Sequence, residues 1–351
     1  MMPAAFGTSA SLLSLAAAMF AMAAGPAAAE APGPMWYLDT LGQPGGMIAD
    51  LTWGLLILSI VVVVMITALV MVAVRGARRN VSMPADHASV KRPSERVPLR
   101  WIYGGLAATA LVLIGFTVWT IGTMVAIAAP EEDEAALTIE ITGHQWWWEV
   151  RYAAEEPPLI VETANEIWIP VGRPVRFKLT SADVIHTFWV PALAGKTDLI
   201  PGQVNTAWFQ ADVPGVFRGQ CNEYCGLQHA HMGLRIFAAP EDEFREWYDA
   251  QLEPADLPEA PEALAGRDVF IEECGACHTV RGTIAGGEMG PDLTHLMSRT
   301  TLAAAMLPNT VGHLSGWIAN PQQVKPGTHM PNPDLSGPQL EAVRSYLVTL
   351  E

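Results

Sequence analysis

Charged residues are scarce in this sequence, at 16% of 351 residues, and two long stretches have none. Residues 51–74 and 101–130 contain no Asp, Glu, Lys or Arg. A helix needs about 20 apolar residues to cross a bilayer, so each stretch is long enough to span one. Together they exclude a wholly soluble chain. They predict a transmembrane hairpin over residues 45–130, with spans at about 51–74 and 101–126.

Basic residues are also few, 20 against 36 acidic ones. Seven of them precede position 131, and all seven lie between the two spans: Arg75, Arg78, Arg79, Lys91, Arg92, Arg96 and Arg100. The positive-inside rule places this loop in the cytoplasm, so residues 131–351 lie outside. That external region has 31 acidic and 13 basic residues, a net charge of −18. Such a region argues against nucleic acid as a partner and favours a basic protein.

The N-terminus has no Lys or Arg before its apolar core at residues 12–23. The run Ala27-Ala28-Ala29 follows this core and is typical of a signal-peptidase site. We therefore expect a signal peptide over residues 1–29. An uncleaved third helix is the alternative, because the usual positive start of a signal peptide is missing.

Cysteine is nearly absent, with four residues that all lie in the external region. So few exclude a disulfide-rich scaffold. Two of them form the sequence Cys274-Gly-Ala-Cys277-His278, the C-x-x-C-H signature of c-type haem attachment. The two thiols would hold the haem vinyl groups, and His278 would bind the iron. A redox dithiol or half of a zinc site would leave the adjacent histidine unexplained.

Met330 is the candidate for the second axial ligand of this haem. It lies in Gly327-Thr-His-Met330-Pro331, and a thioether opposite histidine raises the haem potential. His329 is the alternative from the same loop. Three other methionines lie nearer in sequence: Met289, Met297 and Met306.

The other two cysteines belong to a cluster of soft ligands. Cys221, Cys225, His229 and Met232 fall within twelve residues, and His186 lies upstream. Thiolate, thioether and imidazole together are typical of copper sites. One cysteine suffices for a single copper, whereas two thiolates can bridge two coppers that each take one histidine. The motif therefore predicts a binuclear copper centre.

A disulfide, a zinc site and a different histidine ligand each fit this cluster less well. A disulfide between the cysteines would leave the histidines and the methionine without a role. A zinc site has no use for Met232. His231 could replace His229, but the spacing C-x3-C-x3-H-x2-M favours His229. His87, His295 and His313 are expected to be surface histidines.

The external region divides into two domains and a linker. Residues 136–240 contain short alternating apolar runs punctuated by Pro and Gly, which predicts an antiparallel β-sandwich or barrel. Residues 241–262 predict one amphipathic helix followed by an acidic, proline-rich linker, which would tether the domains without fixing their orientation. Residues 263–351 are expected to be helical at both ends, with long loops between.

These motifs together resemble cytochrome c oxidase subunit II with a fused C-terminal cytochrome c domain. The resemblance implies a multidomain membrane protein. Its parts are a two-helix transmembrane hairpin, an all-β cupredoxin-like Greek-key barrel and an all-α class I cytochrome c domain. It implies copper ligation by His186, Cys221, Glu223 through its backbone carbonyl, Cys225, His229 and Met232.

The resemblance also implies roles that residue patterns do not give. Trp146, in His144-Gln145-Trp146-Trp147-Trp148, would relay electrons to copper, and Glu223 would contribute to a magnesium site shared with subunit I. On a strand, Trp146 and Trp148 would share one face and Trp147 the other. Many family members have a glutamate before the tryptophan that opens the second span. Here Pro98-Leu-Arg-Trp101 stands at that place, so no proton-uptake residue is assigned.

The function expected from this resemblance is electron input to a respiratory terminal oxidase of the proton-translocating type. Electrons would pass from cytochrome c through haem c and the copper pair to subunit I, which reduces oxygen. Subunits I and III and the lipid bilayer would be partners. The chain would lie in a bacterial inner membrane, with its C-terminal region in the periplasm. The alternatives are a copper-containing subunit of a nitric oxide reductase and, from a different class, a membrane-tethered copper chaperone.

Overall fold

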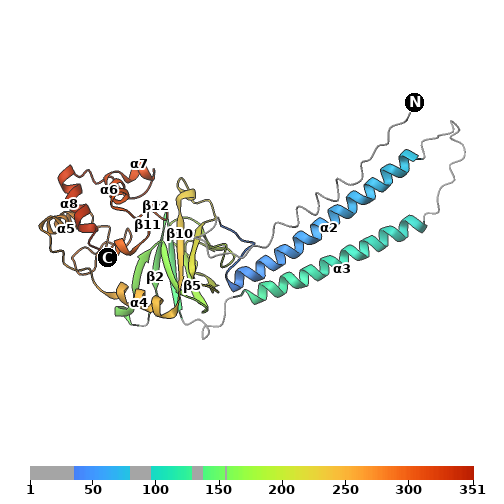
Figure 1. Cartoon of the computed structure of the whole chain (residues 1–351), viewed down its shortest axis with the longest axis horizontal. Coiled ribbons are helices and arrows are strands. Elements are labelled where there is room, and N and C mark those ends of the chain that lie inside the picture. The colour runs from blue at the N-terminus through green and yellow to red at the C-terminus, as the bar shows by residue number, and fades with distance from the viewer. Residues whose placement is uncertain (1–34, 80–95, 129–136, 155) are drawn as a thin grey trace, which may run out of the picture.

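The computed structural model describes residues 35–79, 96–128, 137–154 and 156–351. Within these ranges the chain forms a pair of long helices, a β domain (137–239) and a C-terminal helical domain (261–351). The β domain lies between the other two parts (Figure 1). The expected signal peptide and the loop at 80–95 lie outside the described residues.

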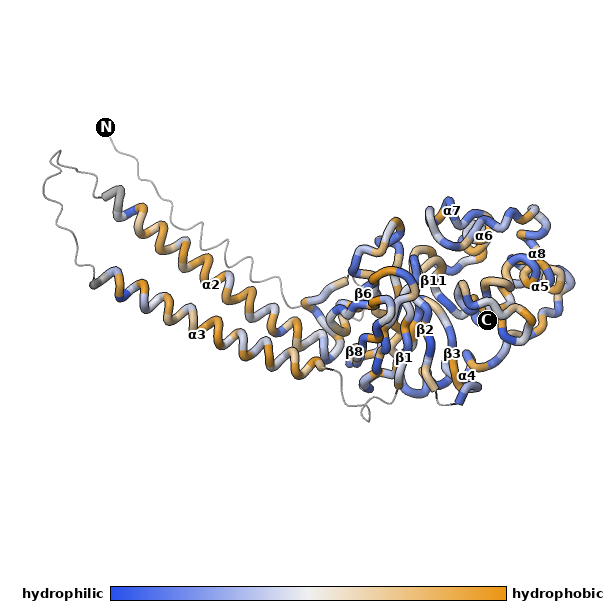
Figure 2. The backbone as a smooth tube through the Cα atoms, turned by 180° about the vertical axis from the view of Figure 1, so that it is seen from behind, coloured by the Kyte–Doolittle hydropathy of each residue, from blue (hydrophilic) through white to orange (hydrophobic). Residues whose placement is uncertain are grey.

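Helices α2 (Gln43–Arg79) and α3 (Arg96–Ala126) are the two apolar helices. The segments Gln43–Gly76 and Pro98–Ala126 are long and apolar enough to cross a membrane. Figure 2 shows hydrophobic residues along most of both helices. The helices meet where a Cβ at Gly54 would lie 2.6 Å from the Trp119 ring. The two predicted apolar helices are therefore present.

The adjoining ends of both helices are fixed to the β domain. Trp208 Nε1 donates to the carbonyls of Ile127 and Ala128, just beyond α3, at 3.2 Å each. Before α2, the Leu41 amide donates to the Ala192 carbonyl (2.7 Å), and the Leu41 carbonyl accepts from the Asp212 amide (2.9 Å). These contacts hold the β domain directly against the ends of the apolar helices.

Two five-stranded sheets form the β domain. Their strand orders are β3-β2-β1-β5-β8 and β4-β10-β9-β6-β7. The first sheet contains β1 (Leu137–His144), β2 (Trp147–Tyr152), β3 (Val161–Ala164), β5 (Val175–Ser181) and β8 (Asn205–Phe209). The second contains β4 (Glu166–Pro170), β6 (His186–Trp189), β7 (Thr197–Leu199), β9 (Gly215–Cys221) and β10 (Gly233–Ala239).

The core lies between the sheets because apolar side chains alternate along the strands. In β2, Trp148, Val150 and Tyr152 are fully buried, while the residues between them are partly exposed. Successive strand residues point to opposite faces, so this pattern marks one inward face. Phe177 and Phe188 meet between the sheets with ring centroids 5.5 Å apart. The cupredoxin-like sandwich is therefore the observed fold.

One feature of the predicted β domain was wrong, because its pairings are not all antiparallel. Strand β1 runs parallel to β5, and β4 runs parallel to β10. Each parallel pair joins strands that are separated by several others in sequence, some of them in the opposite sheet. Apolar alternation identifies the strands, but it does not show which strands become neighbours.

Helix α4 (Glu241–Leu252) and the linker after it connect the two external domains. Trp247 on α4 stacks on Trp168 of the β domain, with centroids 5.4 Å apart. The linker then contacts the C-terminal helical domain, where the Ala255 amide donates to the Arg281 carbonyl at 3.0 Å. His295 was expected at the surface, but it is buried between the carbonyls of Glu253 (3.0 Å) and Glu351 (2.6 Å).

The C-terminal helical domain is built around the crossing of its first and last helices. A Cβ at Gly266 would lie 1.8 Å from the Ala342 carbonyl, so glycine permits this close approach. The helices of the domain are α5 (Pro261–Glu273), α6 (Val311–Ala319), α7 (Pro321–Val324) and α8 (Gly337–Leu347). A short pair, β11 (Thr301–Leu302) and β12 (Leu307–Pro308), lies between α5 and α6. Apart from this pair, the regular structure is helical as predicted.

The two external domains are docked in one orientation. Glu166 of β4 is buried and accepts hydrogen bonds from the Thr300 amide (2.9 Å), the Thr300 hydroxyl (2.7 Å) and the Thr301 hydroxyl (2.5 Å). Nearby, the Gly233 amide donates to the Ala304 carbonyl at 3.0 Å. The expectation that the linker leaves the orientation unfixed is therefore not met, because side chains far from the linker form the contact.

Candidate metal and haem sites

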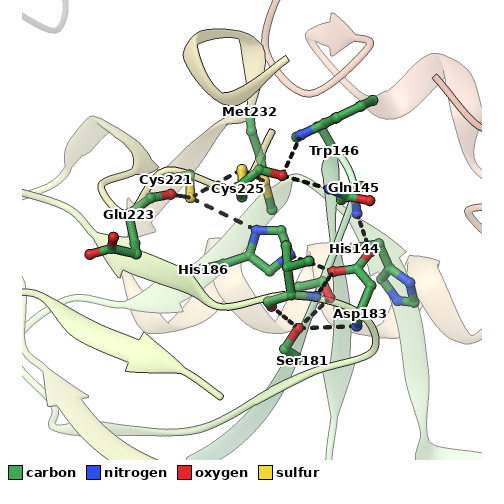
Figure 3. A network of polar contacts seen from close by, with 12 residues as sticks. His144, Gln145, Trp146, Ser181, Asp183, His186, Cys221, Glu223, Cys225 and Met232 are labelled. Carbon is green, nitrogen blue, oxygen red and sulfur yellow. Dashed lines mark hydrogen bonds and ion pairs between the residues drawn. The ribbon is translucent and has the colours of Figure 1, made fainter. Parts of the chain in front are cut away.

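The cluster of sulfur and imidazole side chains lies at one end of the second sheet. His186 begins β6, and Cys221 ends the adjacent strand β9. A loop then carries Cys225 and His229 and returns to β10, just after Met232. Because β6 and β9 are paired, with Phe188 opposite Cys221, residues 35 positions apart in sequence reach the same place. Figure 3 shows His186 and both cysteines converging.

The donor atoms lie within reach of a shared metal cluster. The two Sγ atoms are 3.8 Å apart. Each has one imidazole beside it: His186 Nδ1 lies 3.9 Å from Cys221 Sγ, and His229 Nδ1 lies 3.6 Å from Cys225 Sγ. Met232 Sδ is 3.9 Å from Cys225 Sγ, and the Glu223 carbonyl is 3.2 Å from Cys221 Sγ. The arrangement is symmetric, with two central sulfurs, one nitrogen on each and one weaker donor on each.

The thiols are poised to lose protons to a metal. Hydrogen bonding from Cys225 lowers the pKa of Cys221 to about 4, and His186 adds to the effect. Cys225 holds the shared proton, so the neighbouring sulfur and burial raise its pKa. Metal binding displaces such protons, because thiolates are the ligands. Soft, buried sulfur and imidazole donors fit copper.

His186 is oriented by a carboxylate behind it. Its Nε2 lies 2.7 Å from Asp183 Oδ1, which leaves Nδ1 directed at Cys221. Burial opposes a charge on His186, but hydrogen bonds to Cys221 and Asp183 outweigh burial and raise its pKa. Asp183 Oδ2 also accepts from the Gln145 amide at 2.6 Å. A carboxylate behind a ligating histidine fixes the ring orientation and increases its basicity.

His231 follows the predicted ligand His229 closely in sequence, but its ring is bound elsewhere. His231 Nδ1 lies 2.7 Å from Gln228 Oε1, and His231 is exposed. Of the two histidines considered from the sequence, the structure brings His229 to the sulfurs. Glu223 contributes its carbonyl to the cluster, while its side chain is directed away from the sulfurs (Figure 3).

Trp146 lies beside the same cluster. It occupies the turn between β1 and β2, not a strand, and is 6% exposed. Its Nε1 donates to the Cys225 carbonyl at 3.1 Å, and Gln145 Nε2 donates to the same oxygen at 2.6 Å. Trp148 instead fills the core, and Trp147 stacks on the His144 ring with centroids 4.4 Å apart. The three consecutive tryptophans therefore have three different surroundings.

The Cys274–His278 turn follows α5 directly. The His278 amide donates to the Cys274 carbonyl at 3.0 Å, so the turn continues the helix geometry. His278 Nδ1 lies 2.8 Å from the Pro291 carbonyl, and a Cβ at Gly290 would lie 2.6 Å from its ring. Burial lowers the pKa of His278 and keeps it neutral. The ring is thus held by one nitrogen, with Nε2 left to bind a metal.

Near this turn, an arginine with a buried Nε atom also fits an anionic prosthetic group. Arg299 Nε is buried and has no hydrogen-bond partner among the described residues. Burial lowers the pKa of Arg299, while nearby Asp292 and Glu166 oppose the shift. An unpaired guanidinium N–H suits a carboxylate of the kind that haem carries. The residues present therefore fit covalent haem.

The Met330 loop is held by Gln322. Its Nε2 donates to the carbonyls of Thr328 (2.7 Å) and Met330 (2.8 Å). His329 is exposed, and its ring centroid lies 6.2 Å from that of Trp146. The loop after α7 therefore adjoins the β domain close to the sulfur cluster.

Four polar residues important for this arrangement do not belong to a recognised motif. Gln145 and Asp183 hold the sulfur cluster, and Glu166 and Lys325 join the two domains. Lys325 Nζ donates to the Trp146 carbonyl at 2.7 Å. A faint sequence signal exists for Lys325, which is the only lysine after residue 196.

Comparisons with known proteins agree with this division. Residues 137–239 match the family described as "Cytochrome C oxidase subunit II, periplasmic domain", and residues 263–351 match "Cytochrome c". A protein named cytochrome c oxidase subunit 2 from Alkalihalophilus pseudofirmus is 35% identical over 319 residues, covering 88% of this chain and 90% of its own length. Its namesake from Bacillus subtilis is 27% identical over 337 residues, with coverages of 90% and 92%.

Solved structures include similar domains. The crystal structure of the periplasmic domain of subunit II of cytochrome oxidase from Bradyrhizobium japonicum is 36% identical. The match covers 35% of this chain and 96% of that chain, with a TM-score of 0.33.

Proposed function

Because this chain belongs to the cytochrome c oxidase subunit 2 family, we propose that it is the electron-input subunit of a respiratory terminal oxidase. As an oxidase subunit with a cytochrome c domain, it has a copper-site domain next to a haem domain. The proposed route runs from an external cytochrome c to haem c, then to a binuclear copper centre, then to subunit I. Oxygen would be reduced in subunit I, which is also where the proton-translocating machinery would lie.

The observation that carries this proposal is the paired donor set. Two thiols 3.8 Å apart, each beside its own imidazole, suit two equivalent metal ions better than one. His186 and Cys221 would serve one copper, and Cys225 and His229 would serve the other. When bound, such a copper pair accepts and releases single electrons. Met232 and the Glu223 carbonyl would act as weak outer ligands, as in other axial copper positions.

The haem would be attached through Cys274 and Cys277 and bound by His278. Burial lowers the pKa of His278 and favours the neutral imidazole, while the hydrogen bond to the Pro291 carbonyl fixes the orientation of the ring. We assign Met330 as the second axial ligand. The His329 ring lies beside Trp146, and this position supports Met330 over His329 as the axial ligand.

The chain's own residues prepare the electron path without moving protons. Gln145 and Trp146 both donate to the Cys225 carbonyl, which fixes the indole against the copper ligands. We propose that Trp146 is the relay between haem and copper. Buried, preorganised groups need little rearrangement when an electron passes, and this favours transfer.

The two apolar helices suit a membrane-bound subunit, as is usual for this family. We propose that the chain lies in a bacterial inner membrane with its domains in the periplasm. Subunit I and subunit III would bind the helices, and the Glu223 side chain would take part in a magnesium site shared with subunit I. Its direction away from the sulfur cluster supports that separate role.

Metal analysis and paramagnetic resonance of the purified complex test the copper assignment. The intact chain should hold two coppers and show hyperfine structure from one electron shared by both nuclei. His229→Ala should abolish the shared pattern. His231→Ala is the matched control and should leave the pattern intact, because His231 is held by Gln228. A single-copper pattern in the intact chain would refute the binuclear centre, and loss only in His231→Ala would refute the ligand assignment.

The terminal acceptor is tested on the same complex. Consumption of oxygen by the reduced enzyme is expected, with electrons supplied through the haem. Turnover of nitric oxide without oxygen consumption would instead place the chain in a nitric oxide reductase. Copper binding without a covalent haem band would favour a copper chaperone.

A further inference from the structure

Lys325 is a buried lysine at the contact between the two external domains. It follows α7 in the C-terminal helical domain and is 2% exposed. Its Nζ donates across the contact to the Trp146 carbonyl (2.7 Å) and within its own domain to the Ala303 carbonyl (3.0 Å). Among the described residues, no carboxylate forms an ion pair with it. Lysine is rarely buried unless its position serves a purpose, because burial of the amino group is costly.

Lys325 binds the backbone of Trp146, whereas the indole side chain of Trp146 contacts a proposed copper ligand. Its indole N–H is bonded to the Cys225 carbonyl at 3.1 Å. The loop at 325–330 covers the indole: a Cβ at Gly327 would lie 3.7 Å from the ring, and the His329 ring lies nearby. Trp146 is thus enclosed between the loop that carries Met330 and the loop that carries Cys225.

Further hydrogen bonds hold the 325–330 loop in place. Gln228 Nε2, from the copper-ligand loop, donates to the Pro326 carbonyl at 2.7 Å. The Ala303 carbonyl that receives Lys325 lies in a turn of three consecutive left-handed alanines, with φ of 55°, 63° and 60° at residues 303–305. Alanine avoids this region, at about 1–2 kcal/mol per residue. Such a turn persists where its surroundings hold it, and Lys325 and Gly233 both bind its carbonyls.

We propose that Lys325 is a positioning residue that clamps the 325–330 loop onto the backbone of Trp146. The clamp lets Trp146 receive electrons from the haem of its own chain and closes Trp146 to external donors. External cytochromes must then deliver electrons to the haem. The inference rests on the proposed function, because it takes Cys225 as a copper ligand and Met330 as a haem ligand.

The step that the clamp serves is a simple one-electron exchange. With both groups bound, the haem held by Cys274, Cys277 and His278 would give up one electron, and the copper pair held by the sulfur cluster would accept it. No bond forms or breaks at Trp146 or Lys325, and no proton is transferred. The rate depends on the separation and coupling of the two centres, which are set by how the loop lies on Trp146.

Lys325→Met in the full oxidase complex tests the clamp. Methionine has a similar length but cannot donate to the two carbonyls. Loss of even one net hydrogen bond shifts an equilibrium by up to roughly tenfold. We therefore expect haem-to-copper transfer, measured after flash reduction of the haem, to slow by about tenfold or more. The haem and copper spectra should stay unchanged, which a general loss of structure would not allow.

A second experiment tests whether Trp146 is closed to external donors, by comparing direct reduction of the copper with reduction through the haem. A small soluble reductant should reduce copper in the intact complex only after the haem. In Lys325→Met it should reduce copper directly, in parallel with the haem. Lys178→Met is the matched control, because Lys178 is exposed on β5 and is paired with Glu140 of the same domain.

The outcomes separate the clamp from the proposed function. Normal spectra with an unchanged transfer rate and no direct copper reduction would overturn the clamp alone. An intact complex without a shared copper signal or a covalent haem band would overturn the proposed function instead. If Lys325→Met fails to assemble, Lys325→Gln is measured instead. Its shorter side chain cannot bring the NH2 group to the position of Nζ between the two carbonyls, so a transfer rate equal to that of the intact complex would also overturn the clamp.

Discussion

Replacement of Glu166 with glutamine should loosen the docking of the C-terminal helical domain. Glu166 lies on β4, far in sequence from the linker, and is 4% exposed. Its Oε1 accepts from both threonine hydroxyls, and its Oε2 accepts from the Thr300 amide at 2.9 Å. In Glu166→Gln, one oxygen becomes an NH2 group. The NH2 group can donate to the threonine hydroxyls, which then accept instead of donating, but all three hydrogen bonds lose the negative charge of the carboxylate.

The size of the effect follows from the type of bond. A hydrogen bond to a charged group contributes about 1.5–3 kcal/mol net, whereas a hydrogen bond between neutral groups contributes about 0.5–1.5 kcal/mol. A loss of about 2 kcal/mol would weaken docking by roughly 30-fold, because each 1.4 kcal/mol is a factor of ten. Truncation to alanine removes all three acceptor contacts and should weaken docking further.

Hydrogen exchange at the Thr300 amide reports this loss directly, since that N–H is bonded to Glu166. Exchange should be roughly 30-fold faster in Glu166→Gln, while amides in the core of each domain keep their protection. Glu140→Gln is the control, because Glu140 is half-exposed in surface ion pairs with Arg151 and Lys178. Equal protection of the Thr300 amide in Glu166→Gln and in the intact chain would refute the role of Glu166 in docking.

Three further measurements follow. Met330→Ala should remove the weak thioether band of the oxidised haem and lower its potential, with the haem still attached; an unchanged spectrum would point to His329. Reduction of the haem by a basic cytochrome should slow with salt, whereas haem-to-copper transfer should not; equal salt dependence would mean undocking. Burial lowers the pKa of Lys325 to about 7, while an exposed lysine has a pKa of about 10.4. Between these two pH values the docked state binds fewer protons than the undocked state, so docking should become more favourable as the pH rises from about 7. Small-angle scattering would measure the docked fraction, and Lys325→Met should show no such pH dependence.

Sites whose ligands lie close together in the sequence can be predicted from the sequence alone. The Cys274–His278 turn needs no long-range contact to be recognised, because attachment and ligation depend on neighbours along one helical turn. The predicted copper motif is similar, since Cys221 ends β9 and Cys225 lies in the loop directly after it. His186 was predicted to stand at the end of another strand, and the structure places it at the start of β6 beside Cys221. The apolar helices were predicted for the same reason, as their signal is continuous in sequence.

Relations between elements far apart in the sequence were not accessible in this way. Glu166 reads as one of many acidic residues, and only the docked structure shows that it meets Thr300, 134 positions later. His295 was misplaced at the surface because its two partners are carbonyls, which carry no sequence signature. The parallel pairing of β1 with β5 has the same origin. Strand alternation fixes which face is buried but leaves the neighbours open.

The docked arrangement changes what the acidic linker does. A short linker alone gives the two domains an effective concentration of about millimolar, so even a weak contact is partly formed. Each net hydrogen bond of about 1 kcal/mol then raises the equilibrium constant for docking several-fold. Glu166, Gln228 and Lys325 together can therefore convert a tethered haem domain into a fixed one. Because Trp146 lies under that fixed domain, the acidic surface can attract a donor but cannot guide it to Trp146. On the route that we propose, the donor must therefore meet the C-terminal helical domain first, and the order of electron flow follows from which face is covered.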